Sequence, residues 1–149
     1  MTCVRVLGTG SPAGDDQAGW WVIDALHGLG IENANGVELD KLDRPGATLV
    51  PRLEHAAHVV LIDAMTSGAA PGTVRQFDRA DWRGYEGGLS SHGFGVFAAL
   101  ALAEAMGSLP PRLDLYGIEI GAAEPGSAIT PAVREAARAL AARLADTLR

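Results

Sequence analysis

A run of aliphatic residues at 58–64, reading His-Val-Val-Leu-Ile-Asp-Ala, constrains the fold of this chain more than any other feature. Strands with apolar residues at consecutive positions are buried on both faces, as in a parallel sheet covered by helices on both sides. The run ends at a carboxylate, Asp63, and ligands of open α/β sheets bind at the carboxyl ends of the strands. The segment therefore predicts an α/β protein with a polar group at its binding edge.

Strands and helices alternate along the rest of the chain. Further strands are predicted at residues 4–7, 37–39, 73–77 and 113–120, and helices at 20–29, 47–55, 90–106 and from Pro131 onward. The connection before the strand at 73–77 is too short for a helical crossover, so this strand is expected to be antiparallel to its neighbour or at an edge. The prediction is a three-layer α/β/α sandwich whose five-stranded sheet is mixed, mostly parallel and contains one antiparallel strand.

Length and composition limit the classes of function. The 149 residues are expected to form a single domain, residues 1–149. A net charge of −6 without a basic stripe argues against nucleic-acid binding. No apolar run approaches the roughly 20 residues that cross a bilayer. One cysteine and the absence of a signal-type segment predict a cytoplasmic protein, and we expect it to be a monomer.

A glycine-rich segment, residues 7–19, follows the first strand and carries the adjacent carboxylates Asp15 and Asp16. Glycines allow a sharp reversal and a close approach of backbone to a ligand. In the predicted architecture Asp16, Asp63 and His92 can converge at the carboxyl edge of the sheet. Two carboxylates and an imidazole suit nickel, zinc or another divalent ion, with coordination positions left open. The alternative is purely structural: Asp16 caps a helix, Asp63 ends a strand and His92 is a loop histidine.

The same glycines permit a second interpretation. The pattern Gly8-x-Gly10-x-x-x-Gly14 resembles a dinucleotide fingerprint, in which Glu38 or Asp40 would bind a ribose. Its spacing differs from the usual fingerprint, and the two carboxylates that follow would lie where a pyrophosphate requires positive potential. We therefore predict no bound dinucleotide. A serine-hydrolase triad is also disfavoured, since no G-x-S-x-G motif is present.

Several other residues receive structural interpretations. Cys3 is expected to pack in the core. Asp15 is interpreted as a turn or cap residue that supports its neighbour. The predicted helix 20–29 is apolar on nearly every face, which indicates either heavy burial or a tryptophan, Trp20 or Trp21, that helps form a surface for a partner. The remaining histidines, expected at the solvated surface, are His27, His55 and His58.

Four blocks in order resemble the hydrogenase maturation proteases, the endopeptidases that trim the C-terminal extension from the large subunit of nickel–iron hydrogenases. The blocks are Val6-Leu7-Gly8-Thr9-Gly10-Ser11 with Asp15-Asp16-Gln17-Ala18-Gly19, then Leu61-Ile62-Asp63-Ala64 with Gly68, Pro71 and Gly72, then Ser90-Ser91-His92-Gly93, and last Tyr116-Gly117-Ile118-Glu119. Many members have asparagine at the position of Ser11 and glutamate at that of Asp16. The resemblance implies the fold predicted above.

The resemblance also implies a function. Asp16, Asp63 and His92 would be the metal-binding and catalytic residues, and the partner would be a nickel–iron hydrogenase large-subunit precursor. Nickel would be presented by the precursor and not held permanently by the enzyme. The metal either activates water or a carbonyl, with an aspartate accepting the proton, or only positions the tail. Residues 78–89 are a candidate loop for gripping that tail. The alternatives are a non-catalytic metal-sensing chaperone and, less favoured, a nucleotide-binding oxidoreductase.

Overall fold

The computed structural model describes residues 3–31, 36–78, 95–121 and 129–148. These residues form a five-stranded sheet in the order β2-β1-β3-β5-β4. Its strands are β1 (Val4–Gly10), β2 (Val37–Asp43), β3 (His58–Met65), β4 (Val74–Phe77) and β5 (Arg112–Glu119). The neighbours β2, β1, β3 and β5 pair in parallel, whereas β4 pairs antiparallel with β5 at the edge. The predicted mixed sheet and the position of its antiparallel strand are confirmed.

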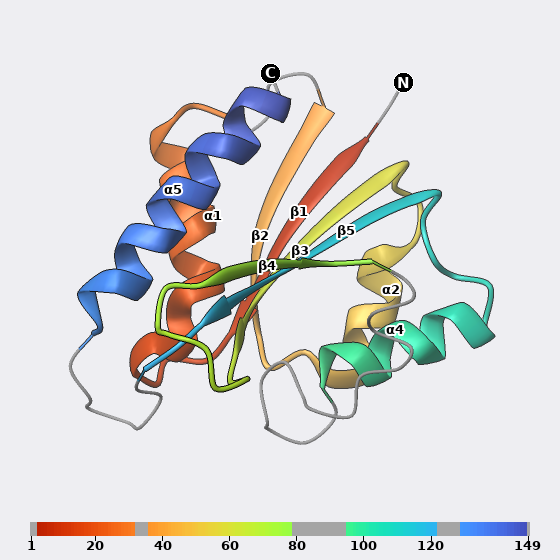
Figure 1. The fold of residues 1–149 in the computed structure, drawn as a ribbon. Helices are drawn as coiled ribbons and strands as arrows, with labels where there is room; N and C mark the ends of the chain where they lie inside the picture. The colour runs from red at the N-terminus through yellow and green to blue at the C-terminus, as the bar shows by residue number, and fades with distance from the viewer. Residues whose placement is uncertain (1–2, 32–35, 79–94, 122–128, 149) are drawn as a thin grey trace.

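Helices cover both faces of this sheet, as Figure 1 shows. The helices α1 (Ala18–Gly28) and α5 (Pro131–Leu148) lie side by side on one face, and α2 (Leu49–Leu53) and α4 (Val96–Ala105) lie on the other. Each face has its own buried hydrophobic cluster. No helix in the described ranges is long and apolar enough to cross a membrane.

The central strand β3 supplies residues to both clusters. Val60 and Ile62 belong to the cluster beneath α1 and α5, whereas Leu61 and Met65 belong to the cluster beneath α2 and α4. Successive side chains of a strand point to opposite faces, so a strand covered on both sides must be apolar at every position. This is the physical reason for the continuous aliphatic run in the sequence.

The strand β1 is longer than predicted, because Gly8 and Gly10 belong to the strand and not to a turn. A Cβ atom at Gly8 would lie 2.3 Å from the backbone oxygen of Gly19 in α1, and one at Gly10 would lie 2.3 Å from the backbone oxygen of Asp16. These glycines therefore let α1 and the turn before it pack directly on the strand. The strand β2 is likewise longer than the predicted segment 37–39.

Two helices differ from their predicted bounds. A 3₁₀ helix, η3 (Gly46–Thr48), precedes α2, and α2 ends before Glu54, whose backbone is extended. The predicted helix at 47–55 was therefore too long, and Pro51 contributes no backbone donor to it. The helix α4 begins at Val96, and its N-cap Gly95 has an extended backbone, so the predicted helix 90–106 is not continuous through Gly95. Its predicted start at Ser90 with a serine cap lies outside the described residues.

The start of α5 was predicted correctly at Pro131. A proline at the first helical position loses no helical hydrogen bond, and its fixed φ suits the helix. The apolar stripe of this helix packs on the sheet and on α1. Its buried members are Val133, Ala137, Leu140, Ala141, Leu144 and Ala145.

Candidate active site

The order of the strands locates the binding edge. From β1 the chain continues to β2 on one side, whereas β3 leads to β5 on the other side. The direction of winding therefore reverses between β1 and β3, and ligands of open α/β sheets bind at such a switch point, beyond the carboxyl ends of the strands. Asp16 follows β1 and Asp63 lies near the end of β3. The two predicted carboxylates thus flank the switch point.

Asp16 is held in a 3₁₀ helix, η1 (Gly14–Gln17), that connects β1 to α1. Its side chain is only 3% exposed, and Ser11 Oγ donates a hydrogen bond of 2.6 Å to its Oδ2. The backbone of Ser11 donates to the Asp16 carbonyl, and Gly14 turns the chain with a φ of 52°. The position of this carboxylate is therefore set by its own loop before any ligand binds.

Asp63 is 1% exposed and belongs to the buried strand β3. Its Oδ1 accepts a hydrogen bond of 2.9 Å from the backbone N–H of Ala64. By the alternation of the strand, its side chain points to the face that carries α2 and α4, as do those of Leu61 and Met65. The neighbouring residue of β5 is Gly117, which adds no side chain beside the carboxylate. The helix η1 also contacts β3, so both carboxylates lie near the same strand end.

The third predicted residue, His92, lies outside the described residues, as does nearly all of the predicted gripping loop 78–89. The described ranges contain no group of three or more histidine, cysteine, aspartate or glutamate side chains arranged to hold a metal ion. Of the three predicted ligands, the structure describes Asp16 and Asp63, two buried carboxylates whose oxygens suit a divalent ion. The convergence of Asp16, Asp63 and His92 stays a prediction.

A third buried carboxylate at this edge, Glu119, was not singled out from the sequence. Glu119 is 3% exposed, ends β5 and lies opposite Met65 of β3. The backbone N–H of Ser67 donates to both of its oxygens at 2.9 and 3.1 Å, and Ser67 Oγ donates at 2.5 Å. Glu119 thereby holds the turn that follows Asp63. A carboxylate that ends a buried strand, the same signal as at Asp63, could have identified it.

Asp15, the neighbour of Asp16, has partners far away in the sequence. It is completely buried, and its oxygens accept hydrogen bonds from the backbone N–H groups of Gly121, at 3.0 Å, and Thr130, at 2.7 Å. The prediction of a local turn or cap residue was therefore too narrow. Asp15 joins η1 to the end of β5 and the start of α5, and so supports the loop that positions Asp16.

A guanidinium lies near the same edge. The backbone N–H of Arg44 donates to the carbonyl of Gly10 at 2.9 Å. The Arg44 side chain pairs with Asp43 at 2.7 Å, which raises the pKa of the guanidinium, and the charge of Asp16 raises this pKa further. The end of β1 therefore carries charges of both signs.

The two tryptophans have separate roles. Trp20 is half-buried, and its Nε1–H donates to the carbonyl of Leu42 at 3.1 Å, which ties α1 to the end of β2. Trp21 is also half-buried, and the guanidinium of Arg134 in α5 lies 5.8 Å from the centre of its ring. The predicted heavy burial therefore holds for part of the helix and not for its two tryptophans. The buried residues of α1 are Ala18, Gly19, Val22, Ile23 and Leu26.

Two structural predictions at the opposite, amino edge of the sheet were wrong. Cys3 is only half-buried, and its thiol donates to Glu38 at 3.5 Å, so it does not pack in the core. The pKa of this thiol is raised mainly by its partial burial, and the negative charge of Glu38 raises it further. His58 is not a solvated histidine, because its Nε2 lies 2.6 Å from Oδ2 of Asp114 and both side chains are largely buried. His27 and His55 are exposed, as predicted.

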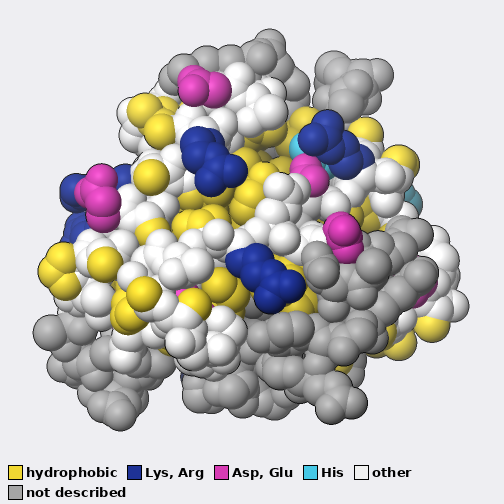
Figure 2. Space-filling view, in the orientation of Figure 1, with side chains coloured by type: hydrophobic (Ala, Val, Ile, Leu, Met, Phe, Trp, Pro, Cys, Tyr) yellow, Lys and Arg dark blue, Asp and Glu magenta, His cyan; other side chains and the backbone are white. Residues whose placement is uncertain are grey.

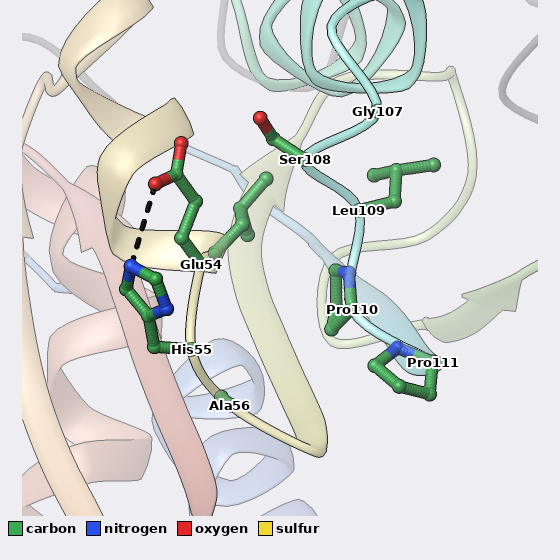
Figure 3. A pocket seen from close by; sticks show the side chains of 9 residues that line it. Glu54, His55, Ala56, Gly107, Ser108, Leu109, Pro110 and Pro111 are labelled. Atoms are coloured by element: carbon green, nitrogen blue, oxygen red, sulfur yellow. Dashed lines mark ion pairs between the residues drawn. The ribbon is translucent and has the colours of Figure 1, made fainter.

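A pocket of about 440 Å³ also lies at the amino edge, away from the candidate carboxylates. It is formed where α2 ends and where the chain enters β5, from Leu53 to Ala56 and from Gly107 to Pro111. In Figure 3 the side chains of Glu54 and His55 point toward each other on one side of it, with an N–O distance of 3.8 Å.

Figure 2 shows basic, acidic and hydrophobic side chains interspersed over the described part of one face of the molecule.

The residues proposed for dinucleotide binding are engaged elsewhere. Glu38 pairs with Arg5 at 3.1 Å, and this hydrogen bond lowers the pKa of the carboxyl group. Asp40 pairs with Arg52 at 2.7 Å. Gly8 is occupied in helix packing, as described above. These contacts do not favour a nucleotide at β2.

Comparison with known proteins adds the family context. A family model described as hydrogenase maturation protease matches residues 44–147. A curated relative, the hydrogenase expression/formation protein HupD of Thiocapsa roseopersicina, is 29% identical over an alignment of 136 residues that covers 89% of this chain. The chain spans 61% of the length of that relative.

Solved structures share the fold over nearly the whole chain. The solution structure of an endopeptidase from Escherichia coli has a TM-score of 0.83 and 24% identity, covering 99% of this chain and 93% of that one. The hydrogenase maturating endopeptidase HybD from E. coli has a TM-score of 0.78 and 24% identity, with coverages of 98% and 94%. The maturation protease HycI from Thermococcus kodakarensis has a TM-score of 0.74 and 20% identity, with coverages of 99% and 92%.

Proposed function

Because the chain belongs to the hydrogenase maturation protease family, we propose that it is an endopeptidase that removes the C-terminal extension of a nickel–iron hydrogenase large-subunit precursor. We further propose that residues 1–149 act as one protease domain and as a monomer. We place the protein in the cytoplasm, because its single cysteine cannot form a disulfide within the chain and disulfides are rare in that compartment.

The observation that carries the proposal is the pair of buried carboxylates at the switch point of the sheet. Asp16 and Asp63 are 3% and 1% exposed, although they belong to different elements. Burying a carboxylate costs free energy unless hydrogen bonds or a cation compensate for the lost hydration. Both carboxylates lie near the same strand end, and each is held by a hydrogen bond from its own segment. This arrangement suits a cationic ligand.

In the proposed reaction the cation is the nickel ion that the precursor carries, so it is part of the substrate. Asp16, Asp63 and His92 bind it and thereby place the scissile bond at the carboxyl edge. A bound divalent ion polarises a carbonyl group and lowers the pKa of a water molecule. One aspartate accepts the proton of the attacking water. Cleavage then depends on prior insertion of nickel, which couples processing to completion of the metal site.

The test is the intact mass of a hydrogenase large-subunit precursor incubated with the protein. The wild type is expected to remove a defined C-terminal peptide from the nickel-loaded precursor and to leave the nickel-free precursor unchanged. The variants Asp16→Asn, Asp63→Asn and His92→Ala are each expected to lower the rate by at least about 100-fold, because the first two lose the negative charge of a ligand and the third loses its imidazole. The exposed carboxylate variant Asp43→Asn is the matched control and should retain activity.

The outcomes separate the remaining hypotheses. An unchanged mass of a cognate, nickel-loaded precursor that nonetheless binds the protein would replace the protease with a metal-sensing chaperone. Equal cleavage of nickel-free and nickel-loaded precursor would remove the nickel dependence and leave the protease.

A further inference from the structure

A second surface feature lies between α1 and α5, on the face of the sheet opposite to that of Asp63. It is a pocket of about 240 Å³ lined by Trp21, Asp24, Ala25, Arg134 and Arg138. Three of these residues, Trp21 and the two arginines, are of the types that contribute most to binding energy at protein interfaces. The candidate active site uses none of them.

The charges around this pocket leave an excess of positive charge. The Asp24 carboxylate pairs with Lys41 at 2.9 Å, so its charge is already balanced. Both arginines are exposed, and within the described ranges neither forms an ion pair. Arg134 lies over the ring of Trp21, with its guanidinium carbon 5.8 Å from the centre. A basic pocket on a chain with a net charge of −6 is a local feature that favours an acidic partner.

The helices that form the pocket begin at the edge of the sheet where the candidate active site lies. Trp21 lies in the first turn of α1 and Arg134 in the first turn of α5, and both helices begin at the carboxyl edge of the sheet. Asp15, next to Asp16, accepts a hydrogen bond from Thr130 just before α5. A protein that extends along this edge can therefore contact the pocket while its tail reaches Asp16 and Asp63.

We propose that the pocket formed by Trp21, Arg134 and Arg138 docks an acidic segment of the hydrogenase precursor, an inference that rests on the proposed function. A carboxylate of that segment binds the two guanidiniums, which offer planar donors that match its oxygens. The apolar part of the same segment packs on the exposed portion of the Trp21 ring. The pocket contributes to the affinity for the precursor and takes no part in bond cleavage.

The test compares Arg138→Gln with Arg143→Gln. Both arginines are exposed on α5, but only Arg138 lines the pocket, so the second variant makes the same change of charge outside it. Arg138→Gln is expected to raise KM for the nickel-loaded precursor about tenfold with kcat unchanged, and to weaken the dependence of KM on salt. Arg143→Gln should match the wild type. Arg138→Lys, which keeps the charge but not the planar donors, should recover part of the affinity.

Dissociation constants for the same precursor, measured with each variant, distinguish failure of this inference from failure of the proposed function. Cleavage by the wild type with equal KM values for Arg138→Gln and Arg143→Gln overturns the docking site and leaves the protease. Precursor that is bound but not cleaved, with binding weakened only by Arg138→Gln, overturns the protease and supports the docking site. A wild type that neither cleaves nor binds the precursor overturns both.

Discussion

The adjacent residues Asp15 and Asp16 show how two identical side chains acquire different roles. Asp15 is completely buried and accepts hydrogen bonds from the backbone of Gly121 and Thr130. Asp16 is nearly as buried but contacts Ser11 within its own loop. The first carboxylate therefore stabilises the tertiary structure, whereas the second is held in place at the candidate site.

This difference predicts that the same substitution mainly lowers stability at Asp15 and mainly lowers processing at Asp16. Asp15→Asn is expected to lower the free energy of unfolding by about 3 kcal/mol, because a neutral amide loses a charge-assisted bond and turns a donor toward a backbone N–H. Asp16→Asn is expected to change it by less than about 1 kcal/mol, since an amide can still pair with Ser11, but to lower the rate of processing by at least about 100-fold. Urea unfolding of both variants checks this. Equal losses of stability would contradict the assignment of roles.

At the scale of elements, the contact between α1 and β1 determines where Asp16 lies. A Cβ atom at Gly8 would lie 2.3 Å from the backbone oxygen of Gly19, and one at Gly19 would lie 2.6 Å from those of Thr9 and Ile62. Such distances are too short for any side chain, and the neighbours are backbone atoms that cannot move away. The glycines therefore permit the close packing that brings η1 against the end of β3.

Substitution of Gly8 by alanine tests this packing. Gly8→Ala is expected to destabilise the protein by about 3 kcal/mol, because α1 must shift away from β1. Gly28→Ala is the matched control: nothing lies within 4 Å of its added Cβ atom, and alanine favours the helix, so a gain of about 0.5 kcal/mol is expected. Thermal or urea unfolding measures both. If Gly8→Ala is as stable as Gly28→Ala, the close contact between α1 and β1 is not required.

At the scale of the whole molecule, the sheet order makes neighbours of strands that carry the acidic residues. The three central strands are β1, β3 and β5, and the buried carboxylates Asp16, Asp63 and Glu119 lie at or just beyond their carboxyl ends. The large hydrophobic side chains that are exposed in the described ranges belong to three separate parts of the chain. They are Leu29, Leu102, Met106 and Ile129.

These surface properties predict that the free protein is a monomer. An association driven by apolar burial requires a contiguous hydrophobic patch, and a net charge of −6 adds repulsion between copies. Sedimentation velocity over a wide range of protein concentration should give one species of about 15.4 kDa. A species of twice this mass whose share grows with concentration would contradict the prediction.

The sequence by itself determined the class of the fold, and it predicted Asp16 and Asp63 as candidate ligands. The aliphatic run of β3 requires burial on both faces, and the short connection to β4 requires an antiparallel or edge strand. The carboxylate Asp63 was identifiable because it ends that run. These are local properties, since they depend on side-chain periodicity and on the length of connections.

The tertiary structure alone decided the rest. The partners of Asp15 and the pairing of His58 with Asp114 join residues far apart in the chain, and the packing of Gly8 on Gly19 depends on how α1 folds back against β1. No local pattern encodes such contacts, because they depend on which strands become neighbours and on how closely a helix approaches them. The role of Glu119 became visible for the same reason: its partner, Ser67, is brought to it only by the pairing of β3 with β5.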